Sequence, residues 1–385
     1  MDHTGRQKSD RVPPAMMIVL IIVALMAVFL LIGSIRMISA RPIAKEESET
    51  QDPVTTVDPG TTVIVDLPVF AAGNSVPLPS ATDRTVTLAA DDSSILAEHA
   101  VLIDAETGEI LAQKAADVSF SPASMTKVMT LLVICERIRE SDLSAKIAFS
   151  EEMHRYVHPS DREDGYYGAG CFGFDPGDTV TLKDALFGIG VSSFADCSIL
   201  AMNYLTDSEE VFTGWMNEEA AAMGLTNTHF DNIIGYDSPE NYTTASEIAA
   251  ILARAIQCPL IREILSTPHY SFTRDGYNSV GEWVTGSSCD YWSTLFNSNS
   301  EKSSRFSAYG IKVNGKLTLE KAIFGGGKTG SLNGTSGSTY LFSLASFATA
   351  KSGGKTYVAV TGADTVNPGK APITDAKTLY DRYIP

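Results

Sequence analysis

An uncharged segment near the N-terminus restricts most strongly what this chain can fold into. Residues 15–35 read AMMIVLIIVALMAVFLLIGSI, which is 21 positions without a charged side chain, and Arg36 follows directly. A helix of that length crosses the hydrocarbon core of a bilayer and exceeds the usual apolar core of a signal peptide. We therefore expect a polar tail at 1–14 and one transmembrane helix at 15–35. Cleavage after Ala40 is the alternative, although Ile38 is bulky for a cleavage site.

The segment after this helix has the composition of a linker. Residues 36–93 are rich in Thr, Pro, Asp, Glu and Ser and show no helical periodicity. Such a composition favours an extended stalk over a packed fold. Residues 94–385 are then long enough for one large folded domain.

The composition excludes several classes of function. The net charge of −17 and the lack of a basic cluster argue against a nucleic-acid partner. The cysteines are widely spaced and form no CxxC, so neither a zinc site nor a disulfide framework is indicated. They are Cys135, Cys171, Cys197, Cys258 and Cys289. His154 and His158 are four residues apart, but Pro159 and the glycines that follow favour a solvated loop over a metal site. We expect no metal and no cofactor.

The order of predicted elements indicates a mixed α/β domain. HAVLIDAETGEILAQ at 99–113 predicts a β-hairpin, and β-rich runs return after residue 330. Helical patterns lie between them, and the predicted helices cover residues 181–205, 208–223, 244–255 and, at the end of the chain, 375–382. Strands at both ends predict one antiparallel sheet that is flanked by helices, together with an all-helical subregion.

A serine and a lysine stand one helical turn apart at the start of an apolar helix. In SPASMTKVMT, Pro122 precedes a pattern of helical spacing, so Ser124 and Lys127 share a face if the helix starts near Ser124. The positive end of the helix and a neighbouring amine would make Ser124 a nucleophile with a base. The spacing alone is also compatible with an N-cap serine and a solvated lysine, and Ser352 and Lys355 match it within a glycine turn.

Two further motifs follow in the chain. The helical stretch that Thr181 opens is interrupted by glycines and by a serine pair, which predicts a joint near Ser193. GGGKTG then places Lys328 and Thr329 between glycines. Such a strand edge suits the binding of a carboxylate, and its backbone can donate hydrogen bonds to a developing oxyanion.

Taken together, these motifs resemble a known family. AVLIDAETGEILAQKAADVSFSPASMTKVMT, NTHFDNIIGYDSPENYTTASEIA and GGGKTG resemble the serine D-alanyl-D-alanine carboxypeptidases, which are low-molecular-mass penicillin-binding proteins. The resemblance covers most of residues 95–385. It implies the serine β-lactamase/DD-peptidase-like α/β fold.

The resemblance also implies roles for individual residues. Ser124 would be the acyl-accepting nucleophile, Lys127 its proton acceptor and Ser193 a proton relay. The substrate-binding residues would be Lys328, Thr329, Gly330 and Ser331, and the backbone N–H groups of Ser124 and Ser331 would hold the oxyanion. Substrates would be peptidoglycan stem peptides ending in D-Ala-D-Ala, with β-lactam antibiotics as mimics, and no cofactor or metal would be needed.

One element departs from the family pattern. Where the family shows Ser-x-Asn, this chain has Ser193-Phe194-Ala195, and its literal Ser-x-Asn at 331–333 follows the KTG in the wrong order. The missing amide leaves substrate affinity and rate in question. A catalytically weakened binding or scaffolding protein is therefore one alternative. A serine β-lactamase is another, but no Glu-x-x-Leu-Asn lies between Ser193 and Lys328.

The implied substrate also determines the expected location. A cell-wall peptide requires the domain to lie outside a single-pass cell membrane protein, with residues 1–14 in the cytoplasm. The basic residues on the two sides of the apolar segment balance, so charge does not decide the orientation. The family often carries a C-terminal β-rich domain and an amphipathic membrane helix, which this sequence does not show, so we expect the N-terminal segment to provide the anchor.

Overall fold

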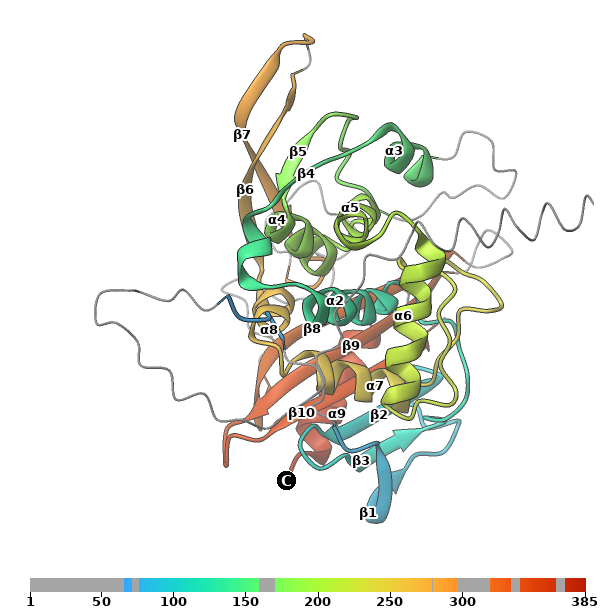
Figure 1. Ribbon diagram of the computed structural model, residues 1–385. Coiled ribbons are helices and arrows are strands. Elements are labelled where there is room, and N and C mark those ends of the chain that lie inside the picture. The colour runs from blue at the N-terminus through green and yellow to red at the C-terminus, as the bar shows by residue number, and fades with distance from the viewer. Residues whose placement is uncertain are drawn as a thin grey trace, which may run out of the picture. The chain divides into compact units, whose positions relative to one another are not determined.

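A computed structural model describes residues 66–70, 76–158, 170–278, 280–296, 319–333, 340–364 and 371–385 (Figure 1). The expected transmembrane helix at 15–35 lies outside these residues. Within the described part of the chain, no helix is long and apolar enough to cross a membrane.

A six-stranded sheet forms the centre of the fold. The strand order is β1-β3-β2-β10-β9-β8. The strands are β1 (Ser80–Thr87), β2 (His99–Asp104), β3 (Glu109–Lys114), β8 (Ala322–Asn333), β9 (Tyr340–Ala350) and β10 (Thr356–Asp364). The predicted hairpin is β2–β3, and β2 pairs with β10 in antiparallel fashion, which confirms that the two ends of the domain meet in one sheet.

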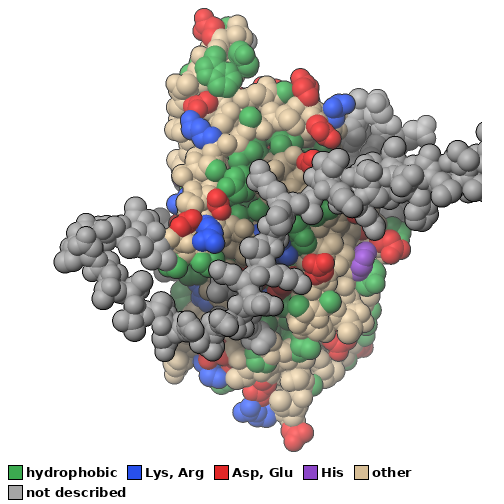
Figure 2. All heavy atoms as spheres, in the orientation of Figure 1, with side chains coloured by type: hydrophobic (Ala, Val, Ile, Leu, Met, Phe, Trp, Pro, Cys, Tyr) green, Lys and Arg blue, Asp and Glu red, His purple; other side chains and the backbone are tan. Residues whose placement is uncertain are grey.

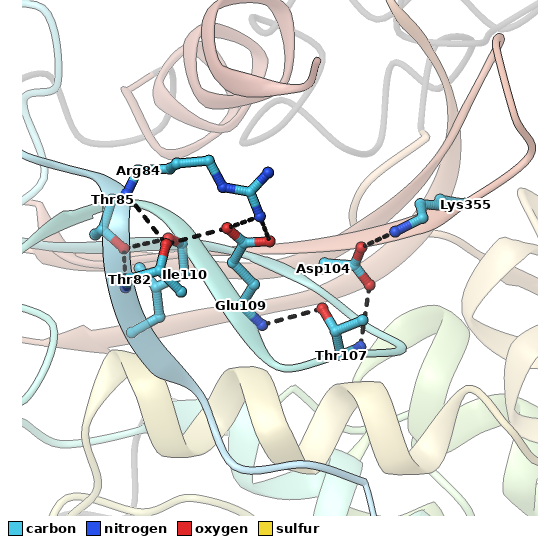
Figure 3. Close-up of polar contacts among 8 residues, drawn as sticks. All are labelled: Thr82, Arg84, Thr85, Asp104, Thr107, Glu109, Ile110 and Lys355. Carbon is cyan, nitrogen blue, oxygen red and sulfur yellow. Dashed lines mark hydrogen bonds and ion pairs between the residues drawn. The ribbon is translucent and has the colours of Figure 1, made fainter.

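Strand β1 begins earlier than the sequence indicated. It lies within the expected linker, yet it pairs with β3, and it does so in parallel, so the sheet is mixed rather than purely antiparallel. Figure 3 shows how the strand is attached: the guanidinium of Arg84 donates to both carboxylate oxygens of Glu109 at 2.6 and 2.7 Å. Asp66 also packs on the domain, because its carboxylate accepts hydrogen bonds from Ser141. The sequence did not predict this strand, because its residues are mostly polar and show no alternation of apolar and polar positions.

The two faces of the sheet bury different cores. On β2, Val101 and Ile103 belong to one cluster and Ala100 and Leu102 to the other, as the alternation of side chains on a strand requires. Helix α9 (Ala371–Tyr383) covers the second face and starts four residues before the predicted helix. Both clusters consist of residues from Val69 onward, so a chain that begins at Ile64 contains the whole described core.

The first face of the sheet is covered by helices (Figure 1). The turn η1 (Ala123–Met125) and the helices α7 (Ala245–Ala255) and α8 (Pro259–Ser266) contact this face, and the other helical elements pack beyond them. Those are α2 (Thr126–Arg137), η2 (Glu140–Ser144), α3 (Glu151–Val157), α4 (Leu182–Phe187), η3 (Gly188–Ser192), α5 (Ala195–Leu205) and α6 (Glu209–Ala222). Helices α6 and α7 lie within one residue of the predicted bounds, with Ser208 and Thr244 as their caps.

The helical part also contains a second sheet, so the prediction of an all-helical subregion is wrong. Its four strands have the order β4-β5-β6-β7. They are β4 (Lys146–Ala148), β5 (Thr179–Thr181), β6 (His269–Tyr277) and β7 (Trp283–Trp292). Strands β4 and β5 have three residues each, which is too short for a period-2 pattern to be distinguished in the sequence.

The helical joint lies where the glycines predicted it. Thr181 and Asp184 form the expected capping box of α4, and η3 is one turn of π-helix that ends at Ser193. A side chain at Gly190 would place its Cβ 2.2 Å from Ile264, so helix α8 needs a glycine there to pack closely.

A pair of substitutions should separate the core from the edge of the sheet. Leu102→Ala removes a fully buried side chain and should lower the free energy of unfolding by about 2–5 kcal/mol. Arg84→Ala removes an ion pair whose arginine side chain is 80% exposed, and should lower it by less than about 1 kcal/mol. Urea denaturation of the chain from Ile64 onward measures both, and equal effects would contradict this description of the core.

Candidate active site

Ser124 lies on a short turn ahead of helix α2 and is not its N-cap. The turn is η1, and the helix begins at Thr126, with Met125 as an N-cap that makes no side-chain capping bond. Ser124 is partly exposed, whereas the residues on either side of it are buried. The capping alternative is therefore wrong, and the hydroxyl of Ser124 is available to react.

The amine of Lys127 is held next to that hydroxyl in the interior of the domain. Its Nζ donates to Ser124 Oγ at 3.2 Å and to the backbone oxygen of Ile234 at 2.6 Å. The side chain of Lys127 is fully buried. A buried amine that keeps two acceptors is a positioned group and not a solvated lysine.

The second acceptor of Lys127 comes from a loop to which the sequence analysis assigned no role in the site. The side-chain oxygen of Asn232 accepts hydrogen bonds from the backbone N–H groups of Gly235 and Tyr236, each at 2.8 Å. This bends the loop so that the oxygen of Ile234 points at Lys127. The sequence does not reveal which backbone carbonyl will accept a hydrogen bond from a lysine. The signal available for this loop was Asn232 three residues before Gly235.

Burial decides the protonation of Lys127. Loss of hydration lowers the pKa of this amine to about 7, and the nearby Cys171, Asp196 and Cys197 side chains act in the opposite direction. Near neutral pH a large fraction of Lys127 is therefore uncharged. An uncharged amine can accept a proton from Ser124.

Ser193 and Lys328 form a second serine–lysine pair. The Nζ of Lys328 donates to Ser193 Oγ at 2.7 Å and to the backbone oxygen of Thr329 at 2.9 Å. Ser193 has a left-handed backbone, with φ of 64°, because it ends η3 immediately before α5. Lys328 is fully buried, and burial together with the charge of Lys127 lowers the pKa of its amine well below the ordinary value.

Strand β8 brings the KTG motif against the turn that carries Ser124. A Cβ at Gly330 would lie 3.1 Å from the backbone oxygen of Pro122, which is a tight contact, so a glycine favours this close approach. The hydroxyl of Thr329 bonds that of Thr294 at 2.8 Å. Because β8 is an edge strand, one side of it has no strand neighbour, and Ser331 is exposed there. The expected oxyanion site between Ser124 and Ser331 stays a prediction.

A loop packs closely over the position where the expected asparagine is missing. Ala195 is fully buried, and its backbone N–H donates to the oxygen of Gly170 at 2.8 Å. The carboxylate of Asp196 accepts from the backbone N–H groups of Phe172 and Gly173 at 3.1 and 2.9 Å. The surroundings of the joint are thus built around alanine, and a larger side chain would press on this loop.

The other candidates from the sequence do not join the site. Lys355 forms an ion pair with Asp104 at 2.7 Å, so the second Ser-x-x-Lys spacing is a structural turn. His154 lies on helix α3, where a loop was predicted, and its ring stacks on that of His158. The described residues contain no group of three or more side chains that could hold a metal, and their five cysteines are free thiols.

The assembled groups define a class of chemistry. A partly exposed serine next to a buried, partly neutral lysine is suited to nucleophilic attack on a carbonyl carbon. A second serine–lysine pair joins Ser193, at the joint before α5, to Lys328 on the strand that borders the turn of Ser124. The arrangement is that expected of a serine acyl-transfer protein in which a lysine serves as the base.

Comparison with known proteins agrees with that class. A family model described as D-alanyl-D-alanine carboxypeptidase matches residues 85–361. The match covers most of the chain, and the chain belongs to this family, the S11 peptidases.

Individual relatives are about 30% identical to the chain over the stretches that align. The D-alanyl-D-alanine carboxypeptidase DacF of Bacillus subtilis is 32% identical over 44% of this chain and 42% of its own length. DacC of Escherichia coli is 31% identical over 49% of this chain and 46% of its own length. The chain thus spans less than half the length of these curated relatives. The enzyme of Streptomyces sp. strain K15 is 30% identical over 58% of this chain and 75% of its own length.

Solved structures have the same fold. The crystal structure of the Streptomyces K15 DD-transpeptidase superposes with a TM-score of 0.56 at 25% identity, over 74% of this chain and 96% of that one. A D-alanyl-D-alanine carboxypeptidase from Mycobacterium tuberculosis gives a TM-score of 0.53 at 22% identity, over 81% of this chain and 94% of that one. The second likeness concerns the fold alone.

The burial of Lys127 predicts the pH dependence of acylation. Acylation of Ser124 by a penicillin should rise with pH about a midpoint near 7, because only the neutral amine of Lys127 accepts the serine proton. An ordinary lysine, with a pKa of ~10.4, would place the midpoint near pH 10. Asp196→Asn removes a negative charge near the amine, which lowers its pKa, so the midpoint should move to lower pH. Stopped-flow rates across pH test this, and an unchanged midpoint in the variant would contradict the electrostatic role of Asp196.

Gly235 should tolerate no side chain. Its φ is +79°, and a Cβ would lie 1.8 Å from the backbone oxygen of Ala123 and 2.9 Å from the nitrogen of Ser124. Gly235→Ala should lower the free energy of unfolding by about 2 kcal/mol or more and abolish acylation. Gly214→Ala on α6 is the matched control, because its Cβ would meet no atom within 4 Å, and alanine there should add about 0.5–1 kcal/mol. Wild-type acylation by the Gly235 variant would refute this account of the loop.

Proposed function

We propose that this protein is a serine-type D-alanyl-D-alanine carboxypeptidase that acts on peptidoglycan stem peptides. The observation that supports this most directly is the pair of hydrogen bonds from Lys127 to Ser124 and from Lys328 to Ser193. Family membership agrees with it. No cofactor takes part in the proposed reaction.

The first half of the reaction is the formation of an acyl-serine. The Oγ of Ser124 attacks the carbonyl carbon between the two D-alanines, and its proton passes to the neutral amine of Lys127. The tetrahedral oxyanion is stabilised by the backbone N–H groups of Ser124 and Ser331. Collapse of this intermediate breaks the peptide bond, and the proton on Lys127 passes through Ser193 to the departing D-alanine amine, which leaves Lys127 neutral again. Water then releases the shortened peptide from Ser124.

The second lysine is suited to hold the C-terminal carboxylate of the substrate. Lys328 is a buried donor on an edge strand, with Thr329, Gly330 and Ser331 following along the same strand. Burial lowers the pKa of Lys328 in the empty site, but a substrate carboxylate next to it acts in the opposite direction. Substrate binding would thereby favour a proton on Lys328 and leave Lys127 neutral, as the attack requires.

The alternative of a weakened binding protein is not favoured. Ala195 motivates it, but Ser124, Lys127, Ser193 and Lys328 are held by hydrogen bonds in one site. Two fully buried lysines are costly to keep without a function.

A covalent-labelling experiment tests the proposal. A fluorescent penicillin should label the wild-type chain, and Ser124→Ala should abolish both the labelling and the release of D-alanine from a D-Ala-D-Ala peptide. Lys127→Ala should slow both by about a hundredfold or more, because positioned general bases contribute 10²–10⁴-fold. Labelling without any D-alanine release would instead support the binding-protein alternative, and equal labelling of the Ser124 variant would exclude Ser124 as the nucleophile.

We also propose a location for the protein, on the sequence alone. Residues 15–35 have the length and composition of a membrane-spanning helix, and a cell-wall substrate requires the domain outside the cell membrane. Protease added to intact protoplasts should therefore remove the folded domain and leave the N-terminal tail protected. Complete protection of the domain would refute this orientation.

A further inference from the structure

The β6–β7 hairpin projects from the domain and leaves one of its faces exposed (Figure 1). Side chains alternate along β6, so that Phe272 is buried while its neighbours Ser271 and Thr273 are exposed. On β7, Tyr291 is buried against Phe272, with ring centroids 4.2 Å apart. The buried side chains attach the hairpin to the domain, and the opposite face contacts solvent.

Aromatic pairs occupy both ends of the exposed face. Near the domain, the rings of His269 and Trp292 stack with centroids 4.0 Å apart, and Trp292 is 44% exposed. Near the tip, the rings of Tyr277 and Trp283 lie 5.2 Å apart, and these residues are 51% and 49% exposed. Figure 2 shows hydrophobic side chains gathered toward the end of the hairpin, at the top of the view. Such exposed aromatic surface is unusual unless it binds something.

The charged side chains that β6 and β7 themselves expose are acidic, and the exposed Lys146 of β4 beside them is paired with Asp275 at 2.6 Å. Between the aromatic pairs, the carboxylate of Asp290 contacts His269 and Ser271, each at 2.7 Å. At the turn, Asn278 donates to the carboxylate of Glu282 at 3.2 Å. None of the exposed residues of β6 and β7 is a lysine or an arginine. Polyanions and anionic bilayers are therefore unsuited to this surface, whereas a neutral polymer rich in hydroxyl groups fits it.

The exposed face begins at the active site. The backbone oxygen of Trp292 accepts a hydrogen bond from Ser192, the neighbour of Ser193, at 3.0 Å. Two residues further on, Thr294 bonds Thr329 of the KTG motif at 2.8 Å. From His269 to Tyr277 a strand extends for about 26 Å at ~3.3 Å per residue. A chain-like ligand bound at the active site could therefore continue along the hairpin.

We propose that this face, the hairpin track (His269, Ser271, Tyr277, Trp283, Asp290 and Trp292), binds a glycan strand of the polymer whose peptides the active site processes. The C–H faces of sugar rings stack on aromatic rings, whose π-faces carry partial negative charge, and sugar hydroxyls donate to carboxylates such as Asp290. The track would select peptides that are still attached to glycan. The choice of polymer rests on the proposed function.

Sedimentation with chitin, an insoluble and uncharged glycan that carries no peptides, tests binding without any catalysis. The chain from Ile64 onward, which contains the whole described core, should co-sediment. The double variant Tyr277→Ser/Trp283→Ser should bind about tenfold more weakly or worse, since exposed aromatic anchors dominate such contacts. Trp283→Tyr alone should retain most of the binding, and Val211→Ser, which alters an exposed apolar residue on α6, should bind like wild type. No binding by wild type, or equal binding by the double variant, overturns the proposal.

A second measurement links the track to the reaction. The ratio of kcat/KM for glycan-linked peptide to that for free peptide should fall about tenfold in the double variant, and an equal fall for both substrates would overturn the proposal. If the wild-type chain releases D-alanine from neither substrate, the proposed function is refuted. The sedimentation experiment would still test whether the track binds glycan. A different outcome is that the wild-type chain binds phosphatidylcholine vesicles and not glycan, while the double variant binds neither. In that outcome the track is a membrane contact and the proposal fails.

Discussion

The burial of two lysine amines next to two serine hydroxyls is the constraint on which the rest of this structure depends. A charged amine in an apolar interior is costly, so each lysine needs acceptors at fixed positions or must lose its proton. The loop around Asn232 supplies the oxygen of Ile234 to Lys127, and strand β8 supplies the oxygen of Thr329 to Lys328. Burial raises the free energy of a charged amine. It therefore also lowers the pKa of Lys127 to about 7, which allows the amine to act as a base near neutral pH.

Three segments that are far apart in the sequence meet at the site. The turn before α2 carries Ser124, the joint before α5 carries Ser193, and β8 carries Lys328. Glycines lie where segments of the site approach closely: a side chain at Gly235 would clash with the backbone of Ala123, and one at Gly330 would lie tightly against that of Pro122. The site is rigid because its parts belong to the core, and not because of any single strong bond.

The missing asparagine shows how such a site adjusts locally. A buried alanine cannot replace an amide hydrogen bond, and here the chain packs a loop on the joint, held by Ala195 and by the buried carboxylate of Asp196. That carboxylate also opposes the fall in the pKa of Lys127. One residue thus affects both the position of the loop and the protonation of the base.

Local patterns were enough to predict the candidate site, since the spacing of Ser124 and Lys127, the joint at Ser193 and the KTG motif all lie within short segments. The sequence also determined the pairing of the terminal strands and the capped helices, because periodicity and caps act over a few residues. The folded structure was needed to distinguish the two Ser-x-x-Lys spacings and to show that the carbonyl of Ile234 accepts from Lys127. It was also needed to reveal β1 and the second, smaller sheet. Burial, backbone acceptors and cross-strand pairing arise between segments far apart in the chain, and no local pattern records them.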